Sequence, residues 1–336
     1  MQIPLENNLN ILRLIFAIQV MLVHLSSHIE DFSSPSFIKH FPGVPSFFFI
    51  SGFLIYTSCQ RLTLKMYFFN RLVRIFPALF FATIGGFIVV LIAKNYIFIW
   101  ENITLISIWF ISQITIGQAF NPSQFRDIGV GVINGSLWTI TVEILFYLAC
   151  PLVILIEKKI KYLVHILILI SFIIYSTEHL FTEFIYRNKT FYDFLELTPL
   201  VWGWMFGVGI LASKHIIVIK EKINYIGIIS ISLILMSIFY DFPFSNTSGN
   251  KLGLPYYLCL SGLILFIAFG VKCFLLKFDL SYGIYIWHMP IINLLIYIGL
   301  KNSYMAILLI GLISFFSWKY IEHPSIKLKN KSLMID

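Results

Sequence analysis

The chain has 336 residues, of which 59% are hydrophobic and 12% are charged, about half the charged fraction of an ordinary soluble domain. Such a chain cannot hide its apolar surface inside one globule, so we expect the lipid bilayer to be its solvent, and we exclude a secreted domain, a disordered chain and a nucleic-acid-binding module. The net charge of +8 comes from basic residues clustered between apolar runs, which is typical of cytoplasmic loops. The four cysteines lack metal or disulfide spacing, and we expect no metal.

Eleven apolar runs are close to the length of about 20 residues that a helix needs to cross the hydrocarbon. In chain order they are 9–25, 44–60, 73–93, 103–120, 137–156, 162–177, 195–212, 223–240, 254–271, 280–299 and 303–320. The first lacks the features of a signal peptide and is interpreted as a retained membrane helix. No repeat or linker is visible. We therefore predict an all-α fold, a polytopic bundle of membrane helices in a single domain over 1–336, with its core at 9–321 and a short cytoplasmic tail at 322–336.

Lysine and arginine indicate which connections face the cytoplasm. The connections rich in these residues are 61–74, 158–161, 214–222, 272–277 and the tail, whereas those at 26–43, 94–136, 178–194, 241–253 and 300–302 are poor in them. Alternation through all eleven runs would place Lys158 to Lys161 outside the cell. The pattern becomes consistent if the more polar run 103–120 does not cross. We predict about ten transmembrane helices, both termini in the cytoplasm, and 103–120 as an interfacial or re-entrant segment.

Ionisable residues within membrane helices are costly, so each is a candidate functional residue. Arg13 and His24 are separated by about 16 Å along the first helix and by about 20° around its axis, so both project from one face. We expect that face to line a polar interior. The alternatives are that Arg13 extends to the inner headgroups and that His24 is a polar residue at the interface. His165, near a lysine-rich end, is interpreted as a structural histidine.

Two further sites contain charged residues. Glu143 lies about 9 Å below the outer end of its helix, at a depth similar to that of His24. A carboxylate there can fix the tautomer of an imidazole and stabilise its cation, or can pair with another buried cation. Arg71 and Arg74 share a helix face at the inner start of the third helix, which suits phosphate binding. The alternative is that these two arginines reflect only the positive-inside rule.

Five short motifs resemble those of the acyltransferase 3 family of bacterial membrane O-acyltransferases. Arg13 and His24 reproduce its Arg-x10-His spacing, and Phe49-Ile-Ser51-Gly-Phe-Leu54 is similar to its aromatic-Ser-Gly-Phe-Leu signature. The stretch from Arg71 through Arg74 to Pro77 resembles its Arg-x-x-Arg-Ile-x-Pro element. Two more matches follow in family order: Ser136-Leu-Trp138 with Glu143, Phe146 and Tyr147, and Ser281-Tyr282 with Tyr285-Ile-Trp287-His288-Met-Pro290. The ending Glu322-His-Pro324 also resembles the family.

The resemblance implies transfer of an acyl group from cytoplasmic acyl-CoA, usually acetyl-CoA, to a sugar hydroxyl of a surface or lipid-linked polysaccharide such as O-antigen or capsule. The chain resembles the stand-alone members of this family, and the resemblance implies a location in the bacterial inner membrane. Arg71, Arg74 and Arg13 would then bind the donor. His24, with Glu143, would deprotonate the acceptor or carry the acyl group transiently. Candidates for the acceptor or acyl cavity are Ser51, Trp138, Tyr285, Trp287 and His288.

Three alternatives stay open. A glycan or lipid transporter or flippase would also contain intramembrane Arg, His and Glu residues. Such proteins usually have repeated halves, whereas the first half here holds Arg13, His24 and Glu143 and the second little beyond His165 and His288. A transferase of the same fold could use a succinyl donor. A purely structural scaffold would leave the intramembrane charges unexplained.

Overall fold

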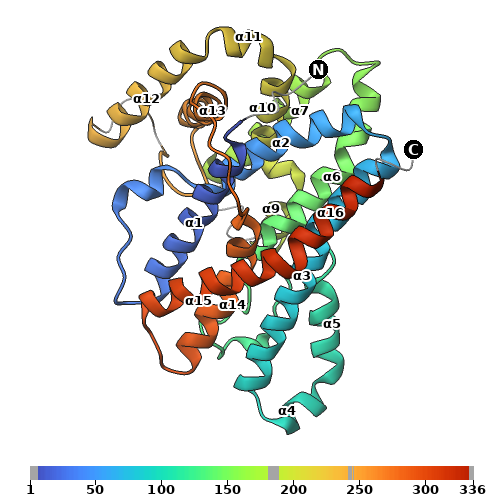
Figure 1. Ribbon diagram of the computed structural model, residues 1–336, viewed down its shortest axis with the longest axis vertical. Helices are drawn as coiled ribbons and strands as arrows, with labels where there is room; N and C mark the ends of the chain where they lie inside the picture. Colours follow the sequence, from blue (N-terminus) through green and yellow to red (C-terminus); the bar gives the residue numbers. More distant parts are fainter. Residues whose placement is uncertain (1–6, 181–188, 241–243, 245, 333–336) are drawn as a thin grey trace. The chain divides into compact units, whose positions relative to one another are not determined.

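The computed structural model describes residues 7–180, 189–240, 244 and 246–332, and the part of the chain that it describes contains helices and no β-strand (Figure 1). Each of the eleven predicted apolar runs contains a helix. The α-helices are α1 (Leu9–His28), α2 (Gly43–Arg61), α3 (Leu64–Ala93), α4 (Tyr96–Glu101), α5 (Ile103–Gln113), α6 (Trp138–Glu157), α7 (Leu163–Leu180), α9 (Lys189–Glu196), α10 (Pro199–Lys214), α11 (Ile216–Glu221), α12 (Ile223–Tyr240), α13 (Leu254–Phe269), α14 (Ser281–Tyr297), α15 (Ser303–Ser317) and α16 (His323–Ser332). Short 3₁₀-helices are η1 (Ser36–His40), η2 (Ser123–Phe125) and η3 (Gly135–Leu137), and η4 (Trp318–Glu322) is a π-helical turn.

The lengths of the helices bear on the predicted number of crossings. In the described residues, seven helical segments are long and apolar enough to cross a membrane. The predicted crossings at α7, α13 and α14 coincide with shorter apolar helices, so the number of about ten stays a prediction. α5 has 11 residues and extends about 16 Å, roughly half the hydrocarbon thickness. A straight helix of this length does not span the hydrocarbon, and the interfacial or re-entrant placement of 103–120 stays a prediction.

The chain forms two compact units that alternate along the sequence. The first unit comprises Met1–Gln19, Ser36–Leu64 and Val142–Lys277, and the second comprises Val20–Pro35, Lys65–Thr141 and Phe278–Asp336. α1 and α6, and α3 through its first residue, contribute to both units because the boundaries fall inside these helices.

In the first unit, α2 and α10 pack with their backbones in contact. A side chain at Gly52 of α2 would overlap the carbonyl of Phe206 in α10, and one at Gly209 of α10 would overlap the carbonyl of Phe49. Close approach of this kind is how membrane helices gain dispersion energy, because lipid supplies no hydrophobic drive for their association. Gly52, in the second of the five motifs, therefore allows the close approach of two helices.

The surface composition of α12 indicates whether lipid or water surrounds this part of the first unit. Its buried positions are mostly small or polar and include Gly227, Ser230 and Ser237, whereas Ile228 and Phe239 expose 63% and 73% of their surface. Small residues inside and large apolar residues outside are the arrangement expected of a helix surrounded by lipid. In water the same surface would be a large exposed apolar patch.

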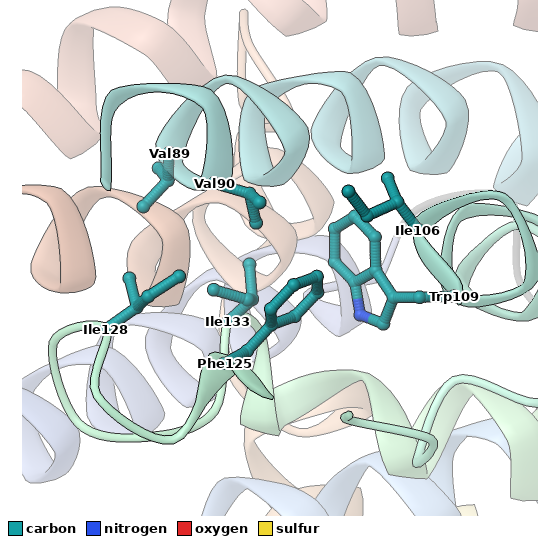
Figure 2. Packing of buried hydrophobic residues seen from close by; sticks show 7 residues of the cluster. All are labelled: Val89, Val90, Ile106, Trp109, Phe125, Ile128 and Ile133. Carbon is teal, nitrogen blue, oxygen red and sulfur yellow. The ribbon is translucent and has the colours of Figure 1, made fainter. Parts of the chain in front are cut away.

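In the second unit, the connection between α3 and α6 folds on its own hydrophobic core. Figure 1 shows α4 joining the end of α3 to α5, which runs back beside it. Figure 2 shows the buried side chains that meet there; they are Val89 and Val90 of α3, Ile106 and Trp109 of α5, and Phe125, Ile128 and Ile133 of the following loop. The Trp109 and Phe125 rings pack edge to face with centroids 5.4 Å apart, a favourable aromatic geometry. The long connection at 94–136 is thus an ordered layer of this unit.

Candidate functional site

His24 and His288 form a pair of hydrogen-bonded imidazoles in the second unit. Nδ1 of His24 in α1 lies 2.8 Å from Nε2 of His288 in α14. The ring centroids are 5.0 Å apart and the ring planes are 13° from parallel. Rings stacked face to face at that separation would hold the two nitrogens farther apart, so the imidazoles meet edge to edge in nearly one plane. An N–H bond lies in the ring plane, and this arrangement therefore favours a straight hydrogen bond.

The surroundings of the two rings differ. His288 is completely buried, and its Nδ1 lies 3.0 Å from the backbone carbonyl of Ile284, one helical turn earlier. His24 is half-buried, and Nε2, its other ring nitrogen, has no hydrogen-bond partner among the described residues. The His28 ring follows one turn later on α1, with its centroid 6.3 Å from that of His24. Sequence analysis placed His24 and His288 in separate roles and did not foresee that they contact each other.

Glu143 is the acceptor of two hydrogen bonds in the first unit. Its Oε1 accepts a bond of 3.2 Å from the hydroxyl of Ser51 in α2 and one of 2.5 Å from the hydroxyl of Tyr147, one turn later on α6. Two predicted site residues, Ser51 and Glu143, are therefore brought together. The predicted pairing of Glu143 with His24 joins residues of different units and stays a prediction. Arg13, also in the first unit, is half-buried in α1. α1 is one unbroken helix over Arg13 and His24, as their predicted common face requires.

The Ser-Leu-Trp segment is attached to α14 by polar contacts of the second unit. The hydroxyl of Ser136 donates to the carbonyl of Tyr285 at 3.2 Å, and the Tyr285 hydroxyl donates to the carbonyl of Ser136 at 3.0 Å. The Tyr285 hydroxyl also lies 2.5 Å from Oγ1 of Thr139. Trp138 is half-buried at the first position of α6. The predicted cavity residue Tyr285 lies about one turn before His288 on α14, so these contacts attach the segment close to His288.

A second set of contacts was missed by sequence analysis because it involves uncharged residues. The side chain of Asn293, which is fully buried in α14, donates to the carbonyls of Val132, Ile133 and Met289 at 2.9 to 3.0 Å. Its Oδ1 accepts a bond of 2.7 Å from the amide of Val130. An asparagine inside an apolar run was the signal that could have revealed it, since an unpaired carboxamide in lipid is costly.

Arg71 and Arg74 lie near the start of α3. The helix has 30 residues, or about 45 Å, so roughly ten residues extend beyond a hydrocarbon layer of about 30 Å. The guanidinium of Arg71 lies over the Tyr67 ring at 5.6 Å. Arg74 acts electrostatically on Glu322, a carboxylate that is 5% exposed and accepts a hydrogen bond of 3.1 Å from Ser317. Sequence analysis had noted Glu322 only as part of a family ending.

Trp287 lines an apolar cavity of about 540 Å³ in the second unit. The indole packs against Gly85 of α3, where no larger side chain would fit. α3, α14, α15 and η4 supply the walls, which include Phe81, Pro290, Phe316 and Tyr320. In the described part of the chain, no group of three or more His, Cys, Asp or Glu side chains is placed to hold a metal ion.

The length and apolar character of these helices indicate a membrane protein, and polar groups are buried within them. A model of the acyltransferase domain matches residues 6–321. The chain belongs to this acyltransferase family, as its five motifs predict. It is 27% identical to Nodulation protein 10 of Rhizobium leguminosarum bv. viciae, over 96% of the chain and 94% of that protein.

A more distant relative comes from a virus. The chain is 24% identical to the protein named "Putative acetyltransferase ORF330" of Acidianus two-tailed virus, over 77% of the chain and 75% of that protein. No solved structure matches the chain significantly. Family membership and the name of this relative support acyltransferase activity.

Proposed function

We propose that the protein is an inner-membrane O-acetyltransferase that moves an acetyl group from cytoplasmic acetyl-CoA to a sugar hydroxyl of a surface or lipid-linked polysaccharide. The observation that carries the proposal is the imidazole of His24, which pairs through Nδ1 with a buried histidine, while its Nε2 has no hydrogen-bond partner within the described part of the chain. The chain belongs to an acyltransferase family. A histidine held in this way has the features of a general base. The donor and the class of acceptor follow from the family resemblance.

In the proposed reaction, Nε2 of His24 removes the proton of the acceptor hydroxyl as its oxygen attacks the thioester carbonyl carbon. The tetrahedral intermediate collapses by breaking the carbon–sulfur bond. The proton held by His24 passes to the leaving thiolate, so the products are an O-acetyl ester and free coenzyme A. General-base assistance of this kind contributes on the order of 10²- to 10⁴-fold in rate. A two-step route, in which His24 carries the acyl group before the acceptor arrives, uses the same residue.

The three arginines form the donor site of this proposal. Arg71 and Arg74 are one helical turn apart, and guanidinium groups bind phosphate oxygens through paired hydrogen bonds. The contact of Arg71 with the Tyr67 ring would restrict the Arg71 side chain before the donor binds, and the nearby Glu322 acts electrostatically with Arg74. Arg13 would lie along the pantetheine arm or complete the phosphate site.

The remaining candidates belong to the acceptor or acyl cavity. Ser51 and Tyr147 hold the carboxylate of Glu143, which would stabilise the positive charge that develops on the base. Tyr285 and Trp138 would shape the entry from the outer side. Trp287, in the wall of the apolar cavity, would contact the apolar part of a lipid-linked acceptor. A succinyl donor would require a further cation near the acyl group.

Membranes that carry the protein test the proposal directly. We would supply radiolabelled acetyl-CoA and total host glycolipid to wild-type, His24→Ala and His165→Ala membranes, and count alkali-labile label in the glycan fraction. His165 lies on α7, where its ring packs against Tyr162, and serves as a matched control. Label with wild type and His165→Ala, and none with His24→Ala, is expected. Wild-type label in His24→Ala would refute the base, and no label from acetyl or succinyl donors would refute the transfer.

A further inference from the structure

We infer that His288 is a positioning residue that fixes the tautomer of His24, with the proton on Nδ1, so that Nε2 is left as the basic atom. The inference deepens the proposed function and rests on it for its catalytic meaning. The structural part, which concerns only where the protons lie, stands on the contacts of the two rings. In this inference the neutral imidazole of His288, and not the carboxylate of Glu143, orients His24.

The protons are assigned by following the hydrogen bonds from the backbone outward. The carbonyl of Ile284 can only accept, so Nδ1 of His288, 3.0 Å away, carries a proton. A neutral imidazole has one N–H group, and Nε2 of His288 is therefore an acceptor. The hydrogen bond of 2.8 Å to Nδ1 of His24 then requires that His24 is the donor. A neutral His24 with its proton on Nδ1 has its lone pair on Nε2.

The other reading, in which His288 is a cation that donates from both nitrogens, is disfavoured by its surroundings. His288 has no exposed surface, and burying a charge without a counter-charge is costly. Among the described residues, the ionisable groups that act on it are the imidazoles of His24 and His28. Both of these become positive when they bind a proton and would repel a charged His288. The neutral form is the one that its site accommodates.

The ring geometry allows a straight hydrogen bond with this proton order. Because the rings are nearly coplanar, the lone pair of His288 and the N–H bond of His24 point along the line that joins them. The ring of His288 is itself held by its i−4 bond to Ile284, so the acceptor direction is set by α14. His24 thus has a fixed ring orientation before an acceptor hydroxyl binds, and pre-organisation of this kind lowers the cost of reaching the transition state.

During transfer, the same bond has a second effect. When Nε2 of His24 takes the proton of the hydroxyl, the ring becomes an imidazolium whose Nδ1–H still donates to Nε2 of His288. Charge-assisted hydrogen bonds are stronger than neutral ones, so the pair is tighter in the charged state than in the resting state. The Nδ1 proton stays on His24, because its transfer to Nε2 of His288 would make a cation of a ring that is fully buried.

Two substitutions of His288 separate orientation from packing. In His288→Gln, the side-chain carbonyl can accept from His24 while the amide donates to the backbone. In His288→Leu, the site is filled but no acceptor remains. We would label the histidines of the intact protein with ¹⁵N in lipid nanodiscs, assign the His24 signals by their loss in His24→Ala, and record which nitrogen carries the proton. His165→Leu is the control for loss of a histidine in a membrane helix.

We expect an Nδ1–H tautomer of His24 in wild type, His288→Gln and His165→Leu, and its loss in His288→Leu. We also expect kcat to fall on the order of 100-fold in His288→Leu with the KM for acetyl-CoA unchanged, and substantial rescue by His288→Gln. An Nε2–H tautomer in wild type, or equal kcat in the Leu and Gln variants, would overturn the inference. Full activity of His24→Ala would instead refute the proposed base, and the wild-type spectrum would still decide the tautomer.

Discussion

The side chain of Asn134 donates a hydrogen bond of 2.9 Å to the backbone carbonyl of Ile286 in α14. Pro290 stands four residues after Ile286 inside this helix, and because proline has no N–H group, the carbonyl of Ile286 lacks its usual helical donor. In a membrane such a carbonyl must find another partner within the protein. Asn134 supplies it, and the loop that precedes α6 is thereby tied to the turns of α14 that carry His288.

Asn293 is predicted to be the main anchor of this loop. Asn293→Ala removes bonds to three carbonyls and one amide, and unsatisfied buried groups cost about 1–3 kcal/mol each. We expect a loss of about 2–4 kcal/mol in unfolding free energy, less than the sum because water reaches part of the loop. Thermal unfolding in detergent would measure it. Asn302→Ala, which removes only the cap of α15, is the control and should cost about 1 kcal/mol; equal effects would refute the anchor.

The contact between α2 and α10 predicts opposite outcomes for two glycine-to-alanine changes. In Gly52→Ala, the new methyl group meets the Phe206 carbonyl, so the helices must separate and stability must fall by about 1–3 kcal/mol. Gly311 lies inside α15 with no atom within 4 Å of an added methyl group. Gly311→Ala should therefore stabilise the protein by about 0.5–1 kcal/mol. Unfolding midpoints of the two variants compare them, and a neutral Gly52→Ala would contradict the packing.

Arg71 and Arg74 are predicted to act on the donor. Arg71→Ala and Arg74→Ala each remove a charged hydrogen-bond donor, worth about 1.5–3 kcal/mol, so we expect the KM for acetyl-CoA to rise roughly 10- to 100-fold with little change in the amount of protein in the membrane. Lys65→Ala removes the same charge from an exposed position in the first turn of α3 and controls for the positive-inside effect. If Lys65→Ala raised KM equally, the two arginines would be topology signals and not ligands.

Features that depend on the local sequence, such as the helices, were predicted better than features that depend on contacts between distant segments. Each of the eleven apolar runs contains a helix, because a backbone in lipid must satisfy its own hydrogen bonds. Any long apolar run reveals this requirement. The lengths were less predictable: α13 ends at Phe269 and α14 at Tyr297, before the ends of their apolar runs. At the end of α14, Gly299 adopts a left-handed conformation that terminates the helix.

The site was predicted in its residues more than in its contacts. His24, Glu143 and His288 stand out because polar groups are rare in apolar runs, but no local pattern states which of them meet. His24 and His288 are 264 positions apart, and only packing of α1 and α14 brings their rings together. The bond from Tyr147 to Glu143 could have been expected from its spacing, because the two residues are one turn apart on the same helix. The bond from Ser51, 92 positions away, could not.

The topology of the chain gives the last prediction. α5 is about half as long as a crossing requires, so the segments on either side of it should lie on the same side of the membrane. In a variant in which Cys59, Cys150, Cys259 and Cys273 are replaced by serine, single cysteines at Lys94 and at Ser123 should react with a membrane-impermeant thiol reagent from outside the cell. A cysteine at Lys159 should react only after the membrane is opened. Protection of one of the two outer positions, or outside labelling at Lys159, would mean that 103–120 crosses, and the termini would then lie on opposite sides.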